Sequence, residues 1–260
     1  MPHAECDGVR LYYERDGSGA PELLFVPGWC CDQTFYAPQF EYFKRRHAVT
    51  ALALRGCGDS DAPDGDYDIP TLADDVARFC AEVGIEKPVV IGHSLGGMIA
   101  IELAARYPAL PRAIVADDPG PIDPTEATVR VFEGFAQQLA GPAGEDVRRA
   151  WVVETAGPTA SDELRRKVID GMCSVPLPIA CAVIEGVTRW NGVAAFLMCE
   201  VPLLVLLSGP GSSNDPSRLQ PLRPLTQFGM TVGSGHFQQL EVPDQLNAMI
   251  ERFLASLTVS

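Results

Sequence analysis

The stretch PVVIGHSLGGMIAIELAARY, residues 88–107, decides the fold. Its first four residues form an apolar run that predicts a buried strand, and residues 98–107 predict a helix that ends before Pro108. Between the two, the glycines of a Gly-x-Ser-x-Gly pattern flank Ser94. A strand followed directly by this pattern and a helix predicts a tight turn that exposes the serine hydroxyl. Ser94 is therefore the candidate nucleophile.

The rest of the chain alternates apolar strand patterns with helical patterns. This alternation is typical of a parallel sheet with crossover helices. We therefore predict an α/β fold with a mostly parallel central sheet flanked by helices. Strands are predicted at residues 9–14, 22–26, 48–54, 113–116, 203–207 and 225–232, and further helices at residues 70–83 and 242–256.

The middle of the chain carries helical patterns and no convincing strand. Such a segment fits a helical insertion that lies over the sheet. We expect one α/β core domain from residues 1–120 and 199–260, with a helical cap insertion at residues 121–198. The helices of the insertion are predicted at residues 125–139, 145–155, 162–173 and 179–190.

A nucleophilic serine needs a base, and the chain contains four histidines. His3 lies near the N-terminus, where we expect a frayed end. His47 belongs to a basic turn that we expect at the surface, and the His93 side chain should point away from the Ser94 hydroxyl. His236 follows the last predicted strand in a Gly-rich loop, where α/β folds place site residues. We predict that His236 is the base.

The third expected site residue is a carboxylate that orients the base. Asp117 and Asp118 directly follow a predicted strand, which would hold either side chain rigidly. Asp215 follows a later strand but lies eight residues beyond its end. We favour Asp117 as the acid, with Asp118 and Asp215 as alternatives. A turn that caps the next helix is another reading of the Asp117-Asp118 pair.

Acyl transfer also needs backbone N–H groups that hold the developing oxyanion. Leu95 begins the helix after Ser94 and offers one of them. The loop at residues 27–32 follows a strand, and Gly28 in it permits a close approach of the backbone. We predict that the Trp29 N–H is the second donor. The competing reading is a plain loop with Trp29 as a packing residue.

The composition restricts the partners. The 260-residue chain has a net charge of −14, and because phosphate contacts need Lys and Arg we expect no nucleic-acid partner. Its N-terminus resembles no signal peptide and no apolar run reaches about 18 residues, so we expect a cytoplasmic protein without a membrane segment. The eight cysteines have no metal-ligand spacing, so we expect free thiols and no metal. A small-molecule substrate is the expected partner, and the oligomeric state is open.

Four short motifs follow one another along the chain. They are Pro27-Gly28-Trp29, Arg55-Gly56-Cys57-Gly58-Asp59-Ser60, Gly92-His93-Ser94-Leu95-Gly96-Gly97, and Gly235-His236-Phe237 before Glu241-x-Pro243. Together they resemble the α/β-hydrolase superfamily over nearly the whole chain, and they look most like its small-esterase, lactonase and non-haem haloperoxidase-like subgroup. The resemblance implies an enzyme that needs no cofactor and binds acyl groups under a helical cap.

The position of the acid resembles a smaller branch, the cofactor-free dioxygenases that open 3-hydroxy-4-oxoquinoline rings. The acid of that branch follows the earlier strand, as Asp117 does here, and the branch shares a Gly-Trp-Cys loop like residues 28–30. A histidine follows that cysteine in the branch, whereas this chain has Cys31.

The predicted function is a serine hydrolase that cleaves a small ester or lactone by acyl transfer to water. Ser94, His236 and Asp117 would form its triad. The alternatives are a cofactor-free dioxygenase of a hydroxylated heteroaromatic ring, a C–C bond hydrolase on the same fold, and a ligand-binding module without catalysis. An intact serine, histidine and carboxylate argue against the last of these.

Overall fold

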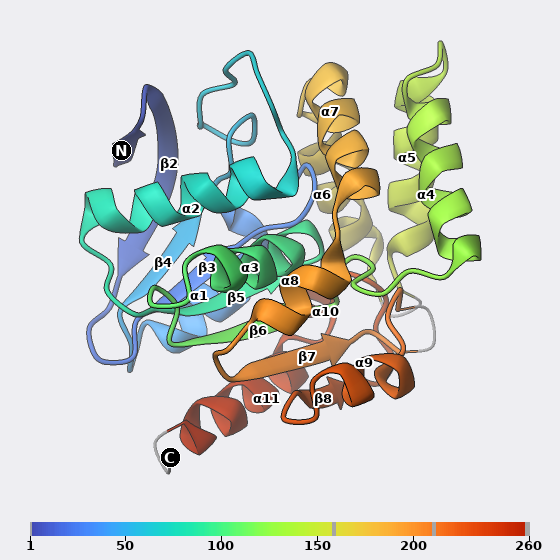
Figure 1. The fold of residues 1–260 in the computed structure, drawn as a ribbon. Helices are drawn as coiled ribbons and strands as arrows, with labels where there is room; N and C mark the ends of the chain where they lie inside the picture. The colour runs from blue at the N-terminus through green and yellow to red at the C-terminus, as the bar shows by residue number, and fades with distance from the viewer. Residues whose placement is uncertain (1, 158–159, 210–211, 258–260) are drawn as a thin grey trace.

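One eight-stranded sheet forms the centre of the computed structural model, which describes residues 2–157, 160–209 and 212–257 (Figure 1). The strand order is β1-β2-β4-β3-β5-β6-β7-β8. The pairs β1–β2 and β2–β4 are antiparallel, and the other five pairs are parallel. The predicted mostly parallel sheet flanked by helices is therefore confirmed. The strands are β1 (His3–Cys6), β2 (Val9–Asp16), β3 (Leu23–Val26), β4 (Val49–Leu52), β5 (Val89–His93), β6 (Ala113–Asp117), β7 (Leu203–Leu207) and β8 (Gln227–Met230).

The N-terminal segment forms β1, an edge strand that we did not predict. His3 pairs with Tyr12 of β2, so the expectation of a frayed end was wrong. Only two buried side chains, Ala4 and Cys6, alternate with exposed ones along this strand. Four residues give too short a period-two signal for a prediction from sequence.

Helices cover both faces of the sheet, as expected for parallel strands joined by crossover helices (Figure 1). On one face α2 and α3 pack together, and α8 packs against α3. On the other face α1 and α11 contact each other. These helices are α1 (Ala37–Phe43), α2 (Ile69–Val83), α3 (Leu95–Arg106), α8 (Gly192–Met198) and α11 (Pro243–Ser256).

The side chains of β6 alternate between these two layers. Ile114 and Ala116 belong to the apolar cluster that contains the α2 and α3 side chains. Ala113 and Val115 belong to the cluster that contains the α1 and α11 side chains. Because the period is two, Asp117 at the end of the strand faces the same layer as Ala113 and Val115.

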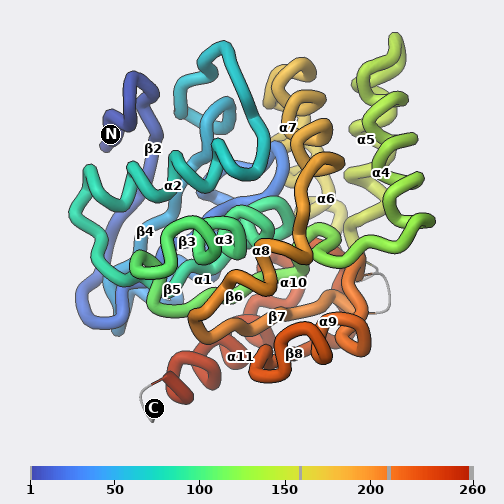
Figure 2. Tube along the Cα trace, in the orientation of Figure 1, coloured from blue at the N-terminus to red at the C-terminus, as the bar shows by residue number. Residues whose placement is uncertain are grey.

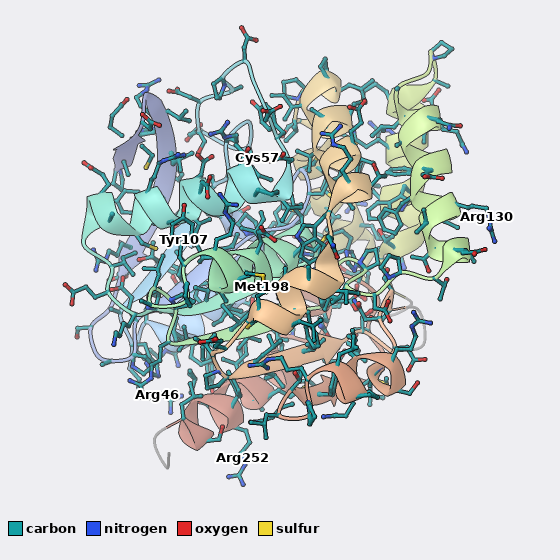
Figure 3. All side chains as sticks on the ribbon, viewed as in Figure 1. Arg46, Cys57, Tyr107, Arg130, Met198 and Arg252 are labelled. Carbon is teal, nitrogen blue, oxygen red and sulfur yellow. The ribbon has the colours of Figure 1, made fainter. Side chains whose placement is uncertain are left out.

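Four helices of the predicted insertion stand together beside the end of the sheet toward which β7 points (Figure 1), and Figure 2 shows α8 returning from them to the core. Helix α4 contacts α5 and α7, and α5 contacts α6. Arg130 points away from the molecule on the outer side of α4 (Figure 3). The helices predicted here are present, whereas the division into core and cap domains stays a prediction. The helices are α4 (Glu126–Leu139), α5 (Gly144–Thr155), α6 (Asp162–Cys173) and α7 (Leu177–Arg189).

Several short helices were not predicted, because one or two turns give no clear helical period. Among the described helices, none is by itself both long and apolar enough to span a membrane, and α6 with α7 meets that test only as a pair bent by 91°. The short helices are the 3-10 helix η1 (Gln33–Tyr36), α1, α8, α9 (Pro216–Leu222) and α10 (Gln238–Glu241).

Candidate active site

The turn between β5 and α3 has the geometry of a nucleophile elbow. Ser94 has φ 53° and ψ −114°, a strained conformation for a residue with a side chain. A Cβ on Gly92 would lie 2.1 Å from the Gly96 carbonyl oxygen, and one on Gly96 would lie 2.1 Å from the Val26 carbonyl oxygen. Both glycines are thus required by the backbone. The Ser94 N–H donates to the Asp117 carbonyl at 2.9 Å, which ties the elbow to the end of β6.

His236 lies in the loop between β8 and α10, and its ring is held by a carboxylate. Its Nδ1 lies 2.6 Å from Oδ2 of Asp118. Because a carboxylate accepts, Nδ1 carries the proton and Nε2 keeps a free lone pair. The ring centroid is 4.7 Å from that of His93, the residue before Ser94. The structure therefore brings His236 next to the elbow, and its role as the base stays a prediction.

The carboxylate beside His236 is Asp118, so the assignment of Asp117 as its partner was wrong. Asp117 follows the alternation of β6 into the layer of α1 and α11 and is fully buried there. Asp118 has φ 41°, a left-handed conformation that turns the chain at the end of the strand. This turn directs the second carboxylate to the edge of the sheet, where the His236 loop lies.

Asp118 is further held by Ser208, which follows β7. The Ser208 hydroxyl donates to Oδ2 at 2.7 Å and the Ser208 N–H donates to Oδ1 at 3.2 Å. Burial raises the pKa of Asp118, but the hydrogen bonds from His236 and Ser208 outweigh burial and lower it. Asp118 is therefore ionised, as an acid that supports an imidazolium must be.

Asp215, the other alternative, does not approach His236. It is exposed and its side chain accepts from the Ser217 N–H at 2.8 Å, which caps the start of α9. The neighbouring Pro210 and Gly211 lie outside the described residues.

The loop with the predicted oxyanion donor lies directly against the elbow. A Cβ on Gly28 would lie 2.9 Å from Nδ1 of His93 and 3.3 Å from Cβ of Ser94. In the described part of the chain, no protein acceptor binds the backbone N–H of Trp29 or of Leu95. Both N–H groups are therefore available to an anion, and their role as oxyanion donors stays a prediction.

His93 holds the His236 loop through a side-chain hydrogen bond. Its Nε2 donates to the His236 carbonyl at 2.8 Å, so the side chain is used in that bond and not toward a substrate. Burial and, to a smaller extent, the neighbouring His236 lower the pKa of His93 to about 3. His93 is thus neutral, and its role is structural.

Aromatic side chains from the inserted helices pack beside His236. The Trp151 ring of α5 lies 6.1 Å from the His236 ring and 5.5 Å from the Trp29 ring. Phe135 of α4 lies 5.7 Å from Trp29, and the Trp29 Nε1 donates to the Ala180 carbonyl of α7 at 3.0 Å. Phe135 and Trp151 lie beside His236 in the structure, whereas the sequence left them unassigned, because aromatic residues at helical spacing more often belong to a core.

The backbone of the insertion also contacts the His236 loop. The His236 N–H donates to the Thr155 carbonyl at 3.0 Å. The Glu241 carboxylate accepts from the Gly157 N–H at 3.1 Å and from the Gly235 N–H at 3.0 Å. A Cβ on Gly157 would lie 2.0 Å from the Gly235 nitrogen, so these two segments meet backbone to backbone. Glu241 belonged to a sequence motif, but its bridging role could not be seen there.

Cys30 and Cys31 beside this site are buried, and burial raises the pKa of both thiols well above the ordinary value. A raised pKa disfavours the reactive thiolate, so both fit a packing role. Within the described residues, no group of three or more His, Cys, Asp or Glu side chains could hold a metal ion.

Comparison with known proteins identifies the family of this chain. The sequence profile of the alpha/beta hydrolase family matches residues 23–249, and the chain therefore belongs to that family. With this fold and these relatives, the protein is an enzyme of the hydrolase type.

Individual relatives are distant. A dihydrolipoyllysine-residue acetyltransferase component of an acetoin cleaving system from Cupriavidus necator is 26% identical over 96% of this chain and 68% of its own length. A putative carbamate hydrolase from Azorhizobium caulinodans is 37% identical, but over only 44% of this chain and 43% of its own length. The crystal structure of an enol-lactonase from Burkholderia xenovorans matches 98% of this chain and 100% of that chain, with a TM-score of 0.85 and 20% identity. This likeness shows the fold alone.

Proposed function

We propose that this enzyme is a serine hydrolase that cleaves a small ester or lactone by acyl transfer to water. Ser94 is the nucleophile, His236 the base and Asp118 the acid. The observation that carries the proposal is the 2.6 Å bond between His236 and Asp118, made next to an elbow whose serine has positive φ. A binding module would need neither this pair nor a strained serine.

The reaction follows from these contacts. His236 Nε2 takes the proton of the Ser94 hydroxyl as the oxygen attacks the carbonyl carbon. Asp118 stabilises the imidazolium that results. The backbone N–H groups of Trp29 and Leu95 bind the oxyanion, and one such donor lowers the barrier by about 3 kcal/mol. The leaving alcohol takes the proton from His236, and water then attacks the acyl-enzyme with His236 again as base.

The insertion at residues 121–198 acts as the cap of this site. Phe135 and Trp151 approach the site from α4 and α5 and supply apolar surface beside His236. An apolar wall favours a small, uncharged acyl or lactone group, since a charged group would be desolvated there without a partner. An enol-lactonase and a putative carbamate hydrolase are among the similar proteins, and both names are consistent with attack on such a carbonyl.

The test is covalent labelling of the serine. We expect a fluorophosphonate to add one adduct to the wild-type protein in intact-mass spectrometry and none to the Ser94→Ala variant. The wild-type protein should also hydrolyse p-nitrophenyl acetate or a γ-lactone. Folded protein without an adduct and without turnover would disprove the hydrolase proposal.

A cofactor-free dioxygenase is the second candidate, and the acid on β6 favours it. Asp118 directly follows β6, the earlier of the two strands after which a triad acid could lie, as in the quinoline-opening branch. In that reaction, His236 would deprotonate a hydroxylated heteroaromatic ring, and Ser94 would only bind it. Metal-independent oxygen uptake with a 3-hydroxy-4-oxoquinoline, unchanged in Ser94→Ala, would favour this candidate over the hydrolase. A C–C bond hydrolase uses the same residues as the ester hydrolase and differs only in substrate.

A further inference from the structure

Asp117 is a buried carboxylate that the proposed triad does not use. It is fully buried, and its Oδ1 accepts from the Gln238 amide at 2.5 Å while its Oδ2 accepts from the Tyr36 hydroxyl at 3.2 Å. Burial raises the pKa of Asp117 to about 7, although the hydrogen bond from Gln238 lowers it. A buried carboxylate is costly even when paired, and an apolar side chain would pack there at lower cost. Its presence therefore calls for a role other than stability.

The partner of Asp117 leads directly to the base. Gln238 lies two residues after His236 and is fully buried. Its Oε1 accepts from the Thr231 hydroxyl at 2.6 Å, and the Thr231 and Ser234 hydroxyls are themselves 2.6 Å apart. The side chain of Gln238 thus holds both ends of the loop that carries His236, and Asp117 holds Gln238.

The main chain of Asp117 makes a second connection. Its carbonyl accepts the Ser94 N–H at 2.9 Å, and the next residue, Asp118, binds His236. The turn at Asp117 and Asp118 therefore contacts the elbow, the His236 ring and the loop that carries His236.

We propose that Asp117 is a positioning residue for His236: it fixes the loop of His236 through its hydrogen bond with Gln238. The inference rests on the proposed function, because it needs His236 to act as the base. The titratable groups that face Asp117 are Tyr36 of η1, His93 of β5, Asp118 and His236.

Two substitutions break the link between Asp117 and Gln238 from its two sides. Asp117→Leu keeps a side chain of similar size but removes the oxygen that accepts from Gln238. Gln238→Met keeps the volume but removes the anchor of the loop. We expect each to lower kcat for p-nitrophenyl acetate by about tenfold or more with little change in KM, because small displacements of a reacting group are costly. Asp117→Asn keeps an oxygen acceptor for Gln238 and should therefore retain most of the wild-type kcat.

The double variant tests whether the two side chains act as a unit. If Asp117 works through Gln238, the double variant should lose little more activity than the poorer single variant, because the second change removes an interaction already broken. Asp215→Asn is the matched control, an exposed carboxylate that caps α9 and is no part of this hydrogen-bond network, and should retain wild-type kinetics.

The outcomes distinguish this inference from the proposed function. A wild-type protein without Ser94-dependent turnover would disprove the function itself. With an active wild-type enzyme, three results would overturn the role of Asp117: wild-type kcat in Asp117→Leu and Gln238→Met, losses that multiply in the double variant, or a loss in Asp117→Asn as large as that in Asp117→Leu. Urea unfolding of each variant identifies any that fail to fold. If Asp117→Leu fails to fold, Tyr36→Phe replaces it, because it removes the other donor to Asp117. Tyr36→Phe should lower kcat less than Gln238→Met does, and an equal or larger loss would overturn the anchoring of the loop through Gln238.

Discussion

Two adjacent carboxylates at the end of β6 have different surroundings and different chemistry. Asp117 stays in the strand and enters the buried layer, whereas Asp118 adopts positive φ and reaches His236. The sequence alone could place a carboxylate here, since Asp117 and Asp118 both follow an apolar run. The sequence does not give the sign of the one backbone angle that separates them. It does place Ala113, Val115 and Asp117 on one face of the strand, and this pattern was a signal that favoured Asp118 as the residue at the edge of the sheet.

Replacing Asp118 tests the acid directly. In Asp118→Asn the amide can donate to Nδ1 of His236, which stabilises the tautomer that cannot act as a base. We expect kcat to fall by roughly a thousandfold or more, with the fold retained because Ser208 can still donate to the side-chain oxygen. Measurement of kcat for p-nitrophenyl acetate checks this prediction. If Asp118→Asn had a small effect on kcat and Asp215→Asn a large one, Asp215 would be the acid.

The raised pKa of Asp117 makes a prediction about stability. Its pKa is about 7 in the folded protein against 3.8 for the free group, so the folded protein keeps a proton that the unfolded chain has lost between these values. This bound proton adds on the order of 4 kcal/mol to the free energy of unfolding. The contribution is fully present below about pH 4 and is lost as the pH rises through 7. Asp117→Asn lacks this term, so its stability relative to wild type should increase from pH 5 to pH 8.

Urea unfolding at several pH values measures that difference, because all other titrating groups are shared by the two proteins. Parallel stability curves would contradict the prediction. An Asp117→Leu variant that is as stable as wild type at pH 8 yet slower in turnover would separate the positioning role of Asp117 from a contribution to folding.

At the scale of elements, the α5–α6 connection and the His236 loop form one junction through Glu241. In Glu241→Gln only one of the N–H groups of Gly157 and Gly235 keeps an oxygen acceptor. A partly buried N–H without a partner costs about 1–3 kcal/mol, so we expect a loss of that size in the free energy of unfolding. The activity should also fall, since the junction includes the N–H of His236.

Glu251→Gln on α11 is the matched control for that prediction. Glu251 pairs with Arg46 at the surface, where ion pairs contribute less than about 1 kcal/mol. Urea unfolding and kcat/KM of both variants check the comparison. Equal effects in Glu241→Gln and Glu251→Gln would mean that the junction does not couple α5 to the base.

The elements themselves differ in how far the sequence predicts them. The buried strands β3, β5, β6 and β7 and helix α2 were predicted because continuous apolar runs and helical periods are strong signals. The elbow and His236 were predicted from a local motif and from the scarcity of histidines. The aromatic cluster of Trp29, Phe135 and Trp151 was not predicted, because its contacts join three distant parts of the chain. Such contacts depend on how the inserted helices pack.

For the whole molecule, the site is assembled where the sheet edge, the inserted helices and the loop after β8 meet. The sheet supplies Ser94 and Asp118 from neighbouring strands, and the loop after the edge strand supplies His236. The inserted helices supply apolar surface and backbone contacts to that loop. A displacement of these helices would therefore change the position of the His236 loop as well as the apolar surface beside it.

The pairing of Trp29 with Trp151 gives the molecule an optical property. Their rings are 5.5 Å apart and nearly perpendicular, with one indole on the core loop and the other on α5. The third tryptophan, Trp190, instead donates to Glu102 of α3 at 2.8 Å. Two of the three indole chromophores thus face each other across the boundary between core and insertion. We therefore expect their near-ultraviolet coupling and emission to change when α5 moves relative to the loop of Trp29, which makes such a movement detectable without an attached label.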